Sequence, residues 1–362
     1  MSLEKFISEA ISPWMKETGP DDDIVMSTRI RLARNVEEFP FPFKSSEDAS
    51  KALYKHVHER LPQPSDERIG KLTWIPIDGL SEIEKTVLVE KHLTSPQLAE
   101  ESTQAAVVLN NDESVSMMVN EEDHLRIQCL FSGFQLGPGY KVASDLDDWI
   151  ESYVDYAFDE KKGYLTSCPT NVGTGLRASV MMHLPALTTT KQLNRILPAI
   201  SQLGLVVRGI YGEGSEARGD LFQISNQMTL GKSEEDIIEE LRGVVLQLIE
   251  RERMTRKNLQ EHNQLQLVDQ VHRSYGILAN SRIIESKEAG RHLSNLRLGI
   301  DLDLIQGIQG NILNELMILI QPAFLQQFAK QQLSPEERDE RRATLIRERL
   351  KLENLNDGGD RP

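Results

Sequence analysis

The chain has 362 residues, 39% of them hydrophobic and 27% charged, and its 41 basic and 56 acidic residues give a net charge of −15. Because domains usually have about 100 to 200 residues, this length predicts two domains. The acidic charge argues against direct binding to nucleic acid, and no run of about 18 apolar residues could cross a membrane. Cys129 and Cys168 lie far apart, so we expect no disulfide, no zinc site and a reducing, cytoplasmic location.

The first predicted element is a strand over residues 27–34, with the sequence STRIRLAR, where basic and apolar residues alternate. Side chains in a strand point alternately to its two faces. Arg29 and Arg31 would therefore share one face, and Ile30 and Leu32 the other. Two neighbouring arginines repel each other unless an anion joins them. The alternative is a solvated strand face with surface ion pairs.

Further short strands are predicted up to about residue 230, because clusters of β-forming residues lie next to Gly and Asn turns. They cover residues 103–111, 114–131, 163–171, 204–212 and 220–227. Two helices are expected between them, over 145–160 and 189–203, where apolar residues recur every three to four positions. The first part of the chain is therefore an α/β mixture built on one sheet.

An acidic cluster, NEEDHLR, occupies residues 120–126 between two strand-like segments. Loops that leave strands often present active-site residues, so the carboxylates of Glu121 and Glu122 could orient a cation while Arg126 faces an anion. Ordinary turn acids are the alternative.

A second motif, SCPTNVGTGLR over residues 167–177, follows a predicted strand. Its two glycines permit close approach of the backbone to a ligand. A helix N-terminus beside Cys168 would favour the thiolate, whereas Cys129, within RIQCLF, is expected to be a small core residue. Taken alone, an inert Cys168 is the simpler interpretation.

The third motif, RGIYGEGSE over residues 208–216, is a glycine-rich loop after the apolar segment GLVV. Arg208 and Glu213 could project opposite charges into one cavity. A plain hairpin turn is the alternative.

The chain almost exclusively favours helix from Ser233 onward. Residues 233–260 have the pattern of one long amphipathic helix. Ser334, Pro335 and Glu337 provide an N-cap, a proline at the first helical position and a capping glutamate, so a last helix is expected to begin there. The second part of the chain is therefore all α.

Taken together, NEEDHLR, CPTNVGTGLR and RGIYGEGSE resemble, in their order and wording, the phosphagen (guanidino) kinase family. The resemblance extends to STRIRLAR, to KHLTSP around His92 and to FQISN before the long helix, so it covers roughly residues 20 to 255. It implies an α/β (α+β) catalytic domain over residues 1–255, with a central, mainly antiparallel sheet flanked by helices. An all-α C-terminal domain over residues 256–362 would follow.

The resemblance also implies an ATP site in which arginines clamp the phosphates and His92 lies at the nucleotide. Such a set of guanidinium groups can bind phosphate oxygens without a Walker lysine. The arginines are Arg29, Arg31, Arg126, Arg177 and Arg208. Their segments would add contacts from Ser27, Thr28, Ile30, Ala178, Ser179, Val180, Met181, Gly209, Ile210, Tyr211 and Gly212. Mg²⁺ would be held mainly by the nucleotide phosphates, so no protein metal site is expected.

The acceptor implied by the resemblance is a guanidinium, which stays protonated because its pKa is above about 12. In similar enzymes two glutamates and a cysteine contact this group. The matching positions are Glu122 as the base, Glu213 as its partner, and Cys168, with Glu121 as a secondary candidate. Glu213 fits arginine-type kinases better than creatine kinase.

The order of the two parts resembles bacterial protein arginine kinases of the McsB type, because the small-molecule enzymes carry a helical domain before the arginine motif instead. This resemblance implies arginine residues of proteins as acceptors. It also implies a homodimer, substrates marked for a Clp-type protease, a heat-shock repressor as a target, and an activator protein. The family's phosphoarginine-sensing pattern, RDxxRA, appears as RDERRA at residues 338–343, so the resemblance implies phosphoarginine sensing by Arg338, Asp339, Arg342 and Ala343.

Three alternatives remain open at this point. The protein could phosphorylate free arginine as an energy store, or it could be a non-catalytic adaptor that binds phosphoarginine. The last helix could also be an ordinary solvated, charged helix.

Overall fold

The computed structural model describes residues 11–209 and 217–356, with side chains up to residue 352. Its centre is an eight-stranded sheet in the order β2-β3-β4-β5-β1-β8-β10-β9, and every neighbouring pair is antiparallel. The strands are β1 (Val25–Arg34), β2 (Thr73–Pro76), β3 (Ala106–Leu109), β4 (Val115–Val119), β5 (Leu125–Ser132), β8 (Leu176–His183), β9 (Leu205–Gly209) and β10 (Leu221–Asn226). A separate ribbon pairs β6 (Phe158–Asp159) with β7 (Gly163–Tyr164). The predicted antiparallel sheet is confirmed.

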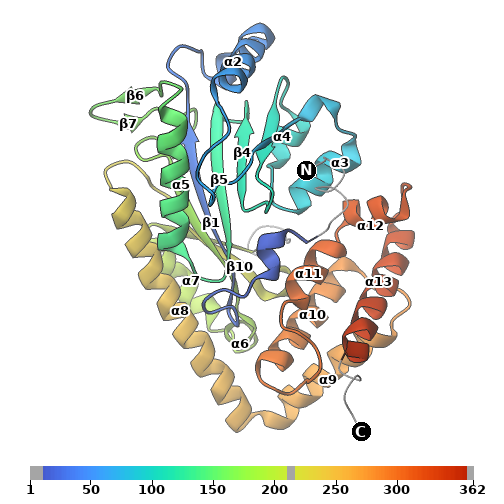
Figure 1. The fold of residues 1–362 in the computed structure, drawn as a ribbon. Helices are drawn as coiled ribbons and strands as arrows, with labels where there is room; N and C mark the ends of the chain where they lie inside the picture. Colours follow the sequence, from blue (N-terminus) through green and yellow to red (C-terminus); the bar gives the residue numbers. More distant parts are fainter. Residues whose placement is uncertain (1–10, 210–216, 357–362) are drawn as a thin grey trace.

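Helices cover both sides of this sheet, with α5 and α8 on one side and α3, α4 and α10–α13 on the other (Figure 1). The helices within the catalytic part are α2 (Glu47–Arg60), α3 (Glu82–Glu90), α4 (Pro96–Glu100), α5 (Leu136–Glu151), α6 (Pro185–Thr189) and α7 (Leu193–Gln202). Those that follow are α8 (Glu234–His262), α9 (Gln264–Asn280), α10 (Ser286–Asp301), α11 (Ile312–Leu319), α12 (Pro322–Ala329) and α13 (Pro335–Asn356). Short 3₁₀ turns are η1 (Pro13–Lys16), η2 (Pro42–Lys44), η3 (Ile77–Gly79) and η4 (Arg218–Asp220).

The two faces of the sheet differ in chemistry because strand residues alternate. Ile30 and Leu32 of β1 are buried in the main core, to which α5 and α8 contribute Leu146 and Leu241. The opposite face of the same strand carries Arg29 and Arg31, as the sequence predicts. One apolar face therefore anchors the sheet, while the opposite face carries the arginines beside apolar residues such as Met118 and Leu130, which pack against α3 and α4.

Helix α8 is the structural link between the sheet and the C-terminal helices. Ser233 and Asp236 form a capping box at its start, and the helix continues without a break to His262. The sequence change at Ser233 marks this start, but residue 255, the expected end of the catalytic domain, lies inside α8. The two-domain division at that residue remains a prediction.

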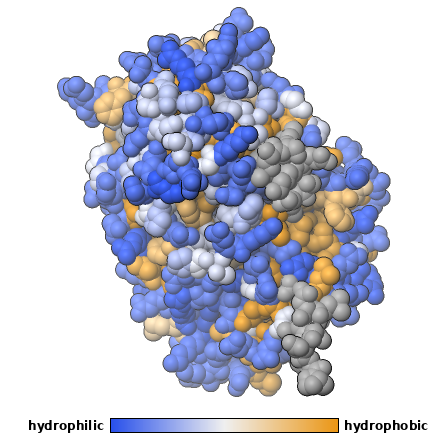
Figure 2. Space-filling view, in the orientation of Figure 1, coloured by the Kyte–Doolittle hydropathy of each residue, from blue (hydrophilic) through white to orange (hydrophobic). Residues whose placement is uncertain are grey.

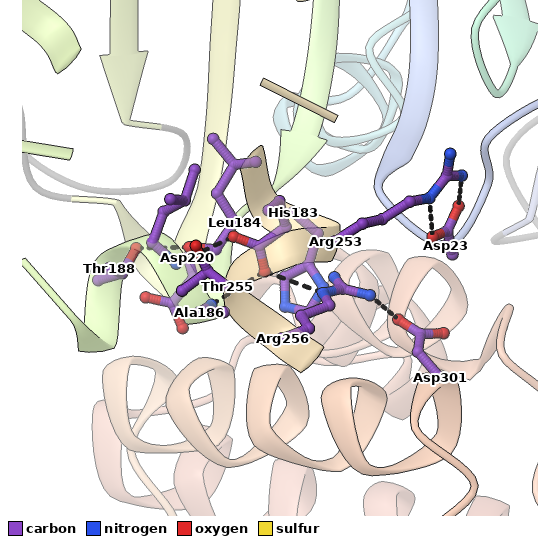
Figure 3. A network of polar contacts seen from close by, with 12 residues as sticks. Asp23, His183, Leu184, Ala186, Thr188, Asp220, Arg253, Thr255, Arg256 and Asp301 are labelled. Carbon is purple, nitrogen blue, oxygen red and sulfur yellow. Dashed lines mark hydrogen bonds and ion pairs between the residues drawn. The ribbon is translucent and has the colours of Figure 1, made fainter. Parts of the chain in front are cut away.

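Buried charges join α8 to α6 and α10 (Figure 3). Glu252 is fully buried and accepts hydrogen bonds from the backbone N–H groups of Ala186 and Leu187, both at 2.9 Å. Arg256, one turn later, donates to Glu252 at 2.9 Å and to Asp301 of α10 at 3.1 Å. Each charge is thereby paired, as burial requires.

The surface is mostly hydrophilic on the face shown in Figure 2, and apolar side chains gather there mainly over the C-terminal helices. Among the helices in the described ranges, none combines the length and apolar character needed to cross a membrane.

Several predicted elements differ in extent from those of the structure, most of all in two segments. The helix expected over 145–160 ends at Glu151, because Tyr156 pairs with Val36 and the N–H of Ala157 donates to Asn35 at 2.7 Å. The strand expected over 163–171 contains only the two residues of β7 and continues as a loop. In both segments contacts with distant residues override the local pattern.

Candidate active site

The register of the sheet places five arginines on one face. Residues directly opposite each other in antiparallel strands project to the same side. Arg31 lies opposite Arg177 on β8 and Gln128 on β5, so Arg126, two residues before Gln128, shares their face. Arg29 lies opposite Ser179 on β8, and Arg208 on β9 lies opposite Gln223 on β10, which itself faces Met181. The predicted phosphate-binding arginines are thus brought together by four strands.

Burial and neighbouring like charges lower the pKa of two of these arginines, Arg31 and Arg177. Burial lowers the pKa of Arg31 well below its ordinary value, and the charges of Arg29, Arg126 and Arg177 lower it further. Burial lowers the pKa of Arg177 as well, followed by the charges of Arg208 and Arg126. The Nε atoms of Arg31 and Arg177 are buried and have no hydrogen-bond partner among the described residues. A bound anion would remove both the repulsion and the missing hydrogen bonds.

Arg29 and His92 lie at one end of this face. Arg29 donates from Nη2 to Gln223 at 2.9 Å and from Nε to Ser179 at 3.5 Å. His92 has a φ of 60°, a strained value for this residue, and its carbonyl accepts a hydrogen bond from Gln128 at 2.8 Å. Burial and the charge of Arg29 lower the pKa of His92 to about 4, so the imidazole is neutral. Together with Trp14, Ser27, Leu130 and Met181, these side chains line a small cavity.

The acidic cluster forms the turn between β4 and β5, where its glutamates separate into two roles. The side chain of Glu121 is 1% exposed, accepts from Arg126 Nη1 at 2.5 Å, and accepts from Ser95 Oγ at 2.6 Å. Glu122 is one-third exposed, and its Oε2 lies 3.3 Å from Arg126 Nη2. Glu121 therefore positions Arg126, whereas Glu122 keeps a surface free for a ligand.

Glu122 meets Cys168 at the edge of the arginine face. The pKa of Glu122 is raised, mainly by burial and also by the charges of Asp123 and Glu121. The charge of Arg126 and a hydrogen bond with Cys168 act in the opposite direction. The thiol of Cys168 also lies 3.0 Å from the hydroxyl of Thr170. A carboxylate with a raised pKa beside a thiol is suited to bind a guanidinium and to accept a proton from it.

Asp123, which the sequence does not single out for a role, holds the Cys168 loop in place. Its Oδ1 accepts from the backbone N–H of Ser167 at 2.6 Å and from Asn35 at 2.7 Å. Because Ser167 precedes Cys168, this carboxylate sets the distance between the two motifs. In the sequence, only the place of Asp123 between Glu122 and Arg126 could have indicated this positioning role.

The two glycines of the Cys168 loop contact the protein itself. A Cβ at Gly173 would lie 2.6 Å from the carbonyl oxygen of Thr229, and one at Gly175 would lie 2.5 Å from Nη1 of Arg34. Both also have positive φ values, of 111° and 66°. Glycine is therefore required at both positions by the fold of the loop itself, and the close approach to a ligand remains a prediction.

The other expected nucleotide contacts divide between the two faces. Ser27, Ser179 and Met181 line the cavity at His92. Ile30, Ala178 and Val180 are buried in the core on the opposite face, so their side chains cannot reach a ligand on the arginine face. Thr28 is also buried, and its Oγ1 donates to the carbonyl of Gly133 at 2.7 Å. Gly209 ends β9, and Ile210, Tyr211, Gly212 and Glu213 lie outside the described residues.

Two glutamines also lie on the arginine face and contact site residues. The sequence alone did not predict either of them as part of the site. Gln128 supports the His92 carbonyl, and Gln223 supports the Arg29 guanidinium. Strand alternation from Arg126 would have placed Gln128 on this face. Cys129, its neighbour, is buried in the core as predicted, and burial raises its pKa to about 12.

The RDERRA segment lies at the start of α13. Arg342 is buried and donates to the carbonyls of Ile320 at 3.2 Å and Ile284 at 3.0 Å, and it pairs with Asp339. Ala343 is buried in the core of the C-terminal helices, and Arg338 is partly exposed. Arg342 therefore holds three segments together in this structure, and phosphoarginine sensing remains a prediction.

Comparisons with known proteins agree with this arrangement. Residues 52–255 match the family described as ATP:guanido phosphotransferase, C-terminal catalytic domain, and residues 264–359 match the protein-arginine kinase McsB C-terminal domain. The protein-arginine kinase of Halalkalibacterium halodurans is 68% identical over 98% of this chain and 99% of its own length. That of Bacillus subtilis is 59% identical over 98% and 97%.

Solved structures show the same fold. A duplicated taurocyamine kinase from Schistosoma mansoni, with bound transition state analog components, aligns with a TM-score of 0.59 and 27% identity. The alignment covers 73% of this chain but only 39% of that one. Lombricine kinase aligns with a TM-score of 0.57 at 22% identity, over 69% and 75% of the two chains. The chain therefore belongs to the protein-arginine kinase family and contains the catalytic domain of the ATP:guanido phosphotransferases.

Proposed function

We propose that this protein transfers the γ-phosphoryl group of ATP to the guanidinium of arginine residues in proteins. The observation that carries this proposal is the meeting of two opposite environments on one sheet face. Five arginines suited to phosphates lie beside Glu122 and Cys168, which suit a cation. The names of the relatives support a protein arginine as the acceptor.

On the donor side, Arg31 and Arg177 would each gain a partner for a buried Nε from phosphate oxygens. Arg29, already oriented by Gln223, and the neutral His92 would hold the rest of the nucleotide. Mg²⁺ would neutralise phosphate charge from the nucleotide itself. Among the described residues no group of three or more His, Cys, Asp or Glu side chains could hold a metal.

On the acceptor side, Glu122 would take one proton from the guanidinium as its nitrogen forms a bond to the γ-phosphorus. The bond from that phosphorus to the bridging oxygen breaks, and ADP leaves with the electron pair. Cys168 would orient the guanidinium, and Arg126, held by Glu121, would lie between donor and acceptor. Alignment of two bound reactants makes the step nearly unimolecular.

The cellular setting is part of the same proposal and rests on the family. We infer a cytoplasmic homodimer whose products are recognised by a Clp-type protease. A heat-shock repressor would be one target, an activator protein would regulate the enzyme, and Arg338, Asp339, Arg342 and Ala343 would sense phosphoarginine.

The test compares two acceptors with ATP and Mg²⁺, an unstructured arginine-rich protein and free arginine. Mass spectrometry without acid should detect phosphoarginine on the protein, because the N–P bond is acid-labile. Rapid turnover of free arginine alone would instead indicate an energy-storing kinase. No transfer to either acceptor would favour a binding adaptor.

A further inference from the structure

Glu90, the last residue of α3, connects the C-terminal helices with the nucleotide end of the site. Its carboxylate accepts two backbone N–H groups of α12, from Ala323 at 2.9 Å and from Phe324 at 3.1 Å. These groups are the second and third of a helix that begins with Pro322, which has no N–H. Helix N-termini leave such donors unpaired, and a carboxylate there is favourable.

Helix α12 has no side-chain cap of its own. Gln321 occupies the N-cap position and makes no capping hydrogen bond, since its amide donates to the carbonyl of Met317. The cap therefore comes from a residue 233 positions earlier in the chain. Ordinary caps come from the helix's own N-cap residue, so this contact fixes two distant elements against each other.

The surroundings make this contact costly to break. Val87 of α3, Ile318 of α11, and Ala323 and Phe324 of α12 form a buried apolar cluster beside Glu90. Burial raises the pKa of Glu90 to about 7 although both N–H groups lower it. Two backbone N–H groups stabilise this partly buried carboxylate, and both would lose their partner if the contact broke.

The two residues that follow Glu90 lead directly into the nucleotide end. Lys91 is fully buried and pairs with Glu113 at 2.7 Å. His92, in its left-handed conformation, joins Arg29 in the wall of the cavity on the arginine face. Of these three consecutive residues, Glu90 contacts α12, Lys91 is buried in the interior and His92 lines the site. A movement of Glu90 would therefore be passed directly to His92.

On its other side, α12 is held by α13. The carbonyl of Ile320, two residues before Pro322, accepts a hydrogen bond from Arg342. The start of α12 is therefore held on one side by Arg342 of the RDERRA segment and on the other by Glu90.

We propose that Glu90 is a positioning residue through which docking of α12 sets the position of His92 and thereby the affinity for ATP. This inference rests on the proposed function for the use of ATP. It assigns to the C-terminal helices a direct effect on nucleotide binding.

The test is Glu90→Gln, which keeps the size of the side chain but offers one acceptor oxygen to two donors. We expect the KM for ATP to rise about tenfold, equal to about 1.4 kcal/mol, with the KM for the protein substrate and kcat changed less than about twofold. Glu82→Gln is the matched control, since Glu82 lies on the same helix and its side chain is 83% exposed. It should leave all three constants unchanged.

Two further variants separate positioning from simple stabilisation. In a His92→Ala background, Glu90→Gln should raise the KM for ATP no further, because both changes act through one residue. Adding Gln321→Ser to Glu90→Gln should restore thermal stability by giving α12 a local cap, while the KM stays high. Additive effects with His92→Ala, or recovery of the KM with the local cap, would overturn the proposal.

Failure of this inference can be told apart from failure of the proposed function. If the wild-type protein forms no phosphoarginine, the proposed function fails. Binding of Mg-ADP, measured by calorimetry, still reports on Glu90 in that case. If transfer is normal and Glu90→Gln binds Mg-ADP as tightly as the wild type, only the coupling through Glu90 is wrong.

Discussion

Adjacent glutamates in the β4–β5 turn should give opposite kinetic signatures when each is changed to glutamine. Glu122→Gln removes the proposed base but leaves Arg126 held by Glu121 at 2.5 Å. Proton transfer by a positioned side chain contributes about 10²- to 10⁴-fold, or about 3 to 5 kcal/mol at 1.36 kcal/mol per decade. Because a third of the Glu122 side chain is exposed and water can partly substitute, we expect a loss in kcat near 10²- to 10³-fold, with the KM for ATP little changed.

Glu121→Gln should act on the nucleotide instead. Its buried pair with Arg126 is a charge-assisted contact, worth about 1.5 to 3 kcal/mol, so the KM for ATP should rise at least tenfold. Steady-state kinetics with varied ATP and a fixed arginine-rich protein measures both constants, and circular dichroism checks the fold. A Glu122→Gln enzyme with normal kcat, or one that loses ATP binding as Glu121→Gln does, would refute this division of roles.

Three further predictions follow from the charges. Because the pKa of Glu122 is raised above its usual 4.5 and the base must be ionised, kcat/KM should fall on acidification at a pH above 4.5; this acid limb should vanish in Glu122→Gln, and a profile unchanged by the variant would contradict the base assignment. Arg31→Met should stabilise the nucleotide-free protein by about 1 kcal/mol in thermal unfolding, because it removes a buried like charge, while ATP binding is lost; destabilisation would show that no repulsion is stored there. Arg342→Ala should cost about 3 kcal/mol of unfolding free energy, because Asp339 and two carbonyls lose their partner, whereas exposed Arg341→Ala should cost almost nothing; equal effects would remove the structural role of Arg342.

The local sequence pattern predicted the structure correctly where strand alternation or helix capping alone determines where a side chain lies. Alternation in STRIRLAR correctly put Arg29 and Arg31 on one face, and Ser334 with Glu337 caps α13 as expected. The strand register then follows from the alternation, since a slip by one residue would turn the arginines into the apolar core on the opposite face.

Contacts between distant residues could not be predicted in this way. Asp123 reads as one more turn acid until Ser167 is seen to donate to it. The same holds for Glu90, whose contact with the start of α12 has no sign in the local sequence. Ile30, Ala178 and Val180 stand beside site residues in the sequence, but alternation turns their side chains to the core. Contacts of their backbone with a nucleotide remain a prediction.

The central position of β1 has a consequence for how the protein is made. This strand is synthesised early, yet its hydrogen-bonded neighbours β5 and β8 come roughly a hundred and a hundred and fifty residues later, as the Thr28–Gly133 and Arg29–Ser179 contacts show. Such non-local pairing slows folding, because the entropic cost of closing a long loop comes before the strand contacts that stabilise it. A nascent chain therefore cannot bring the five arginines together until β8, β9 and β10 have left the ribosome. If these arginines bind ATP as proposed, nucleotide binding can begin only after the sheet has formed.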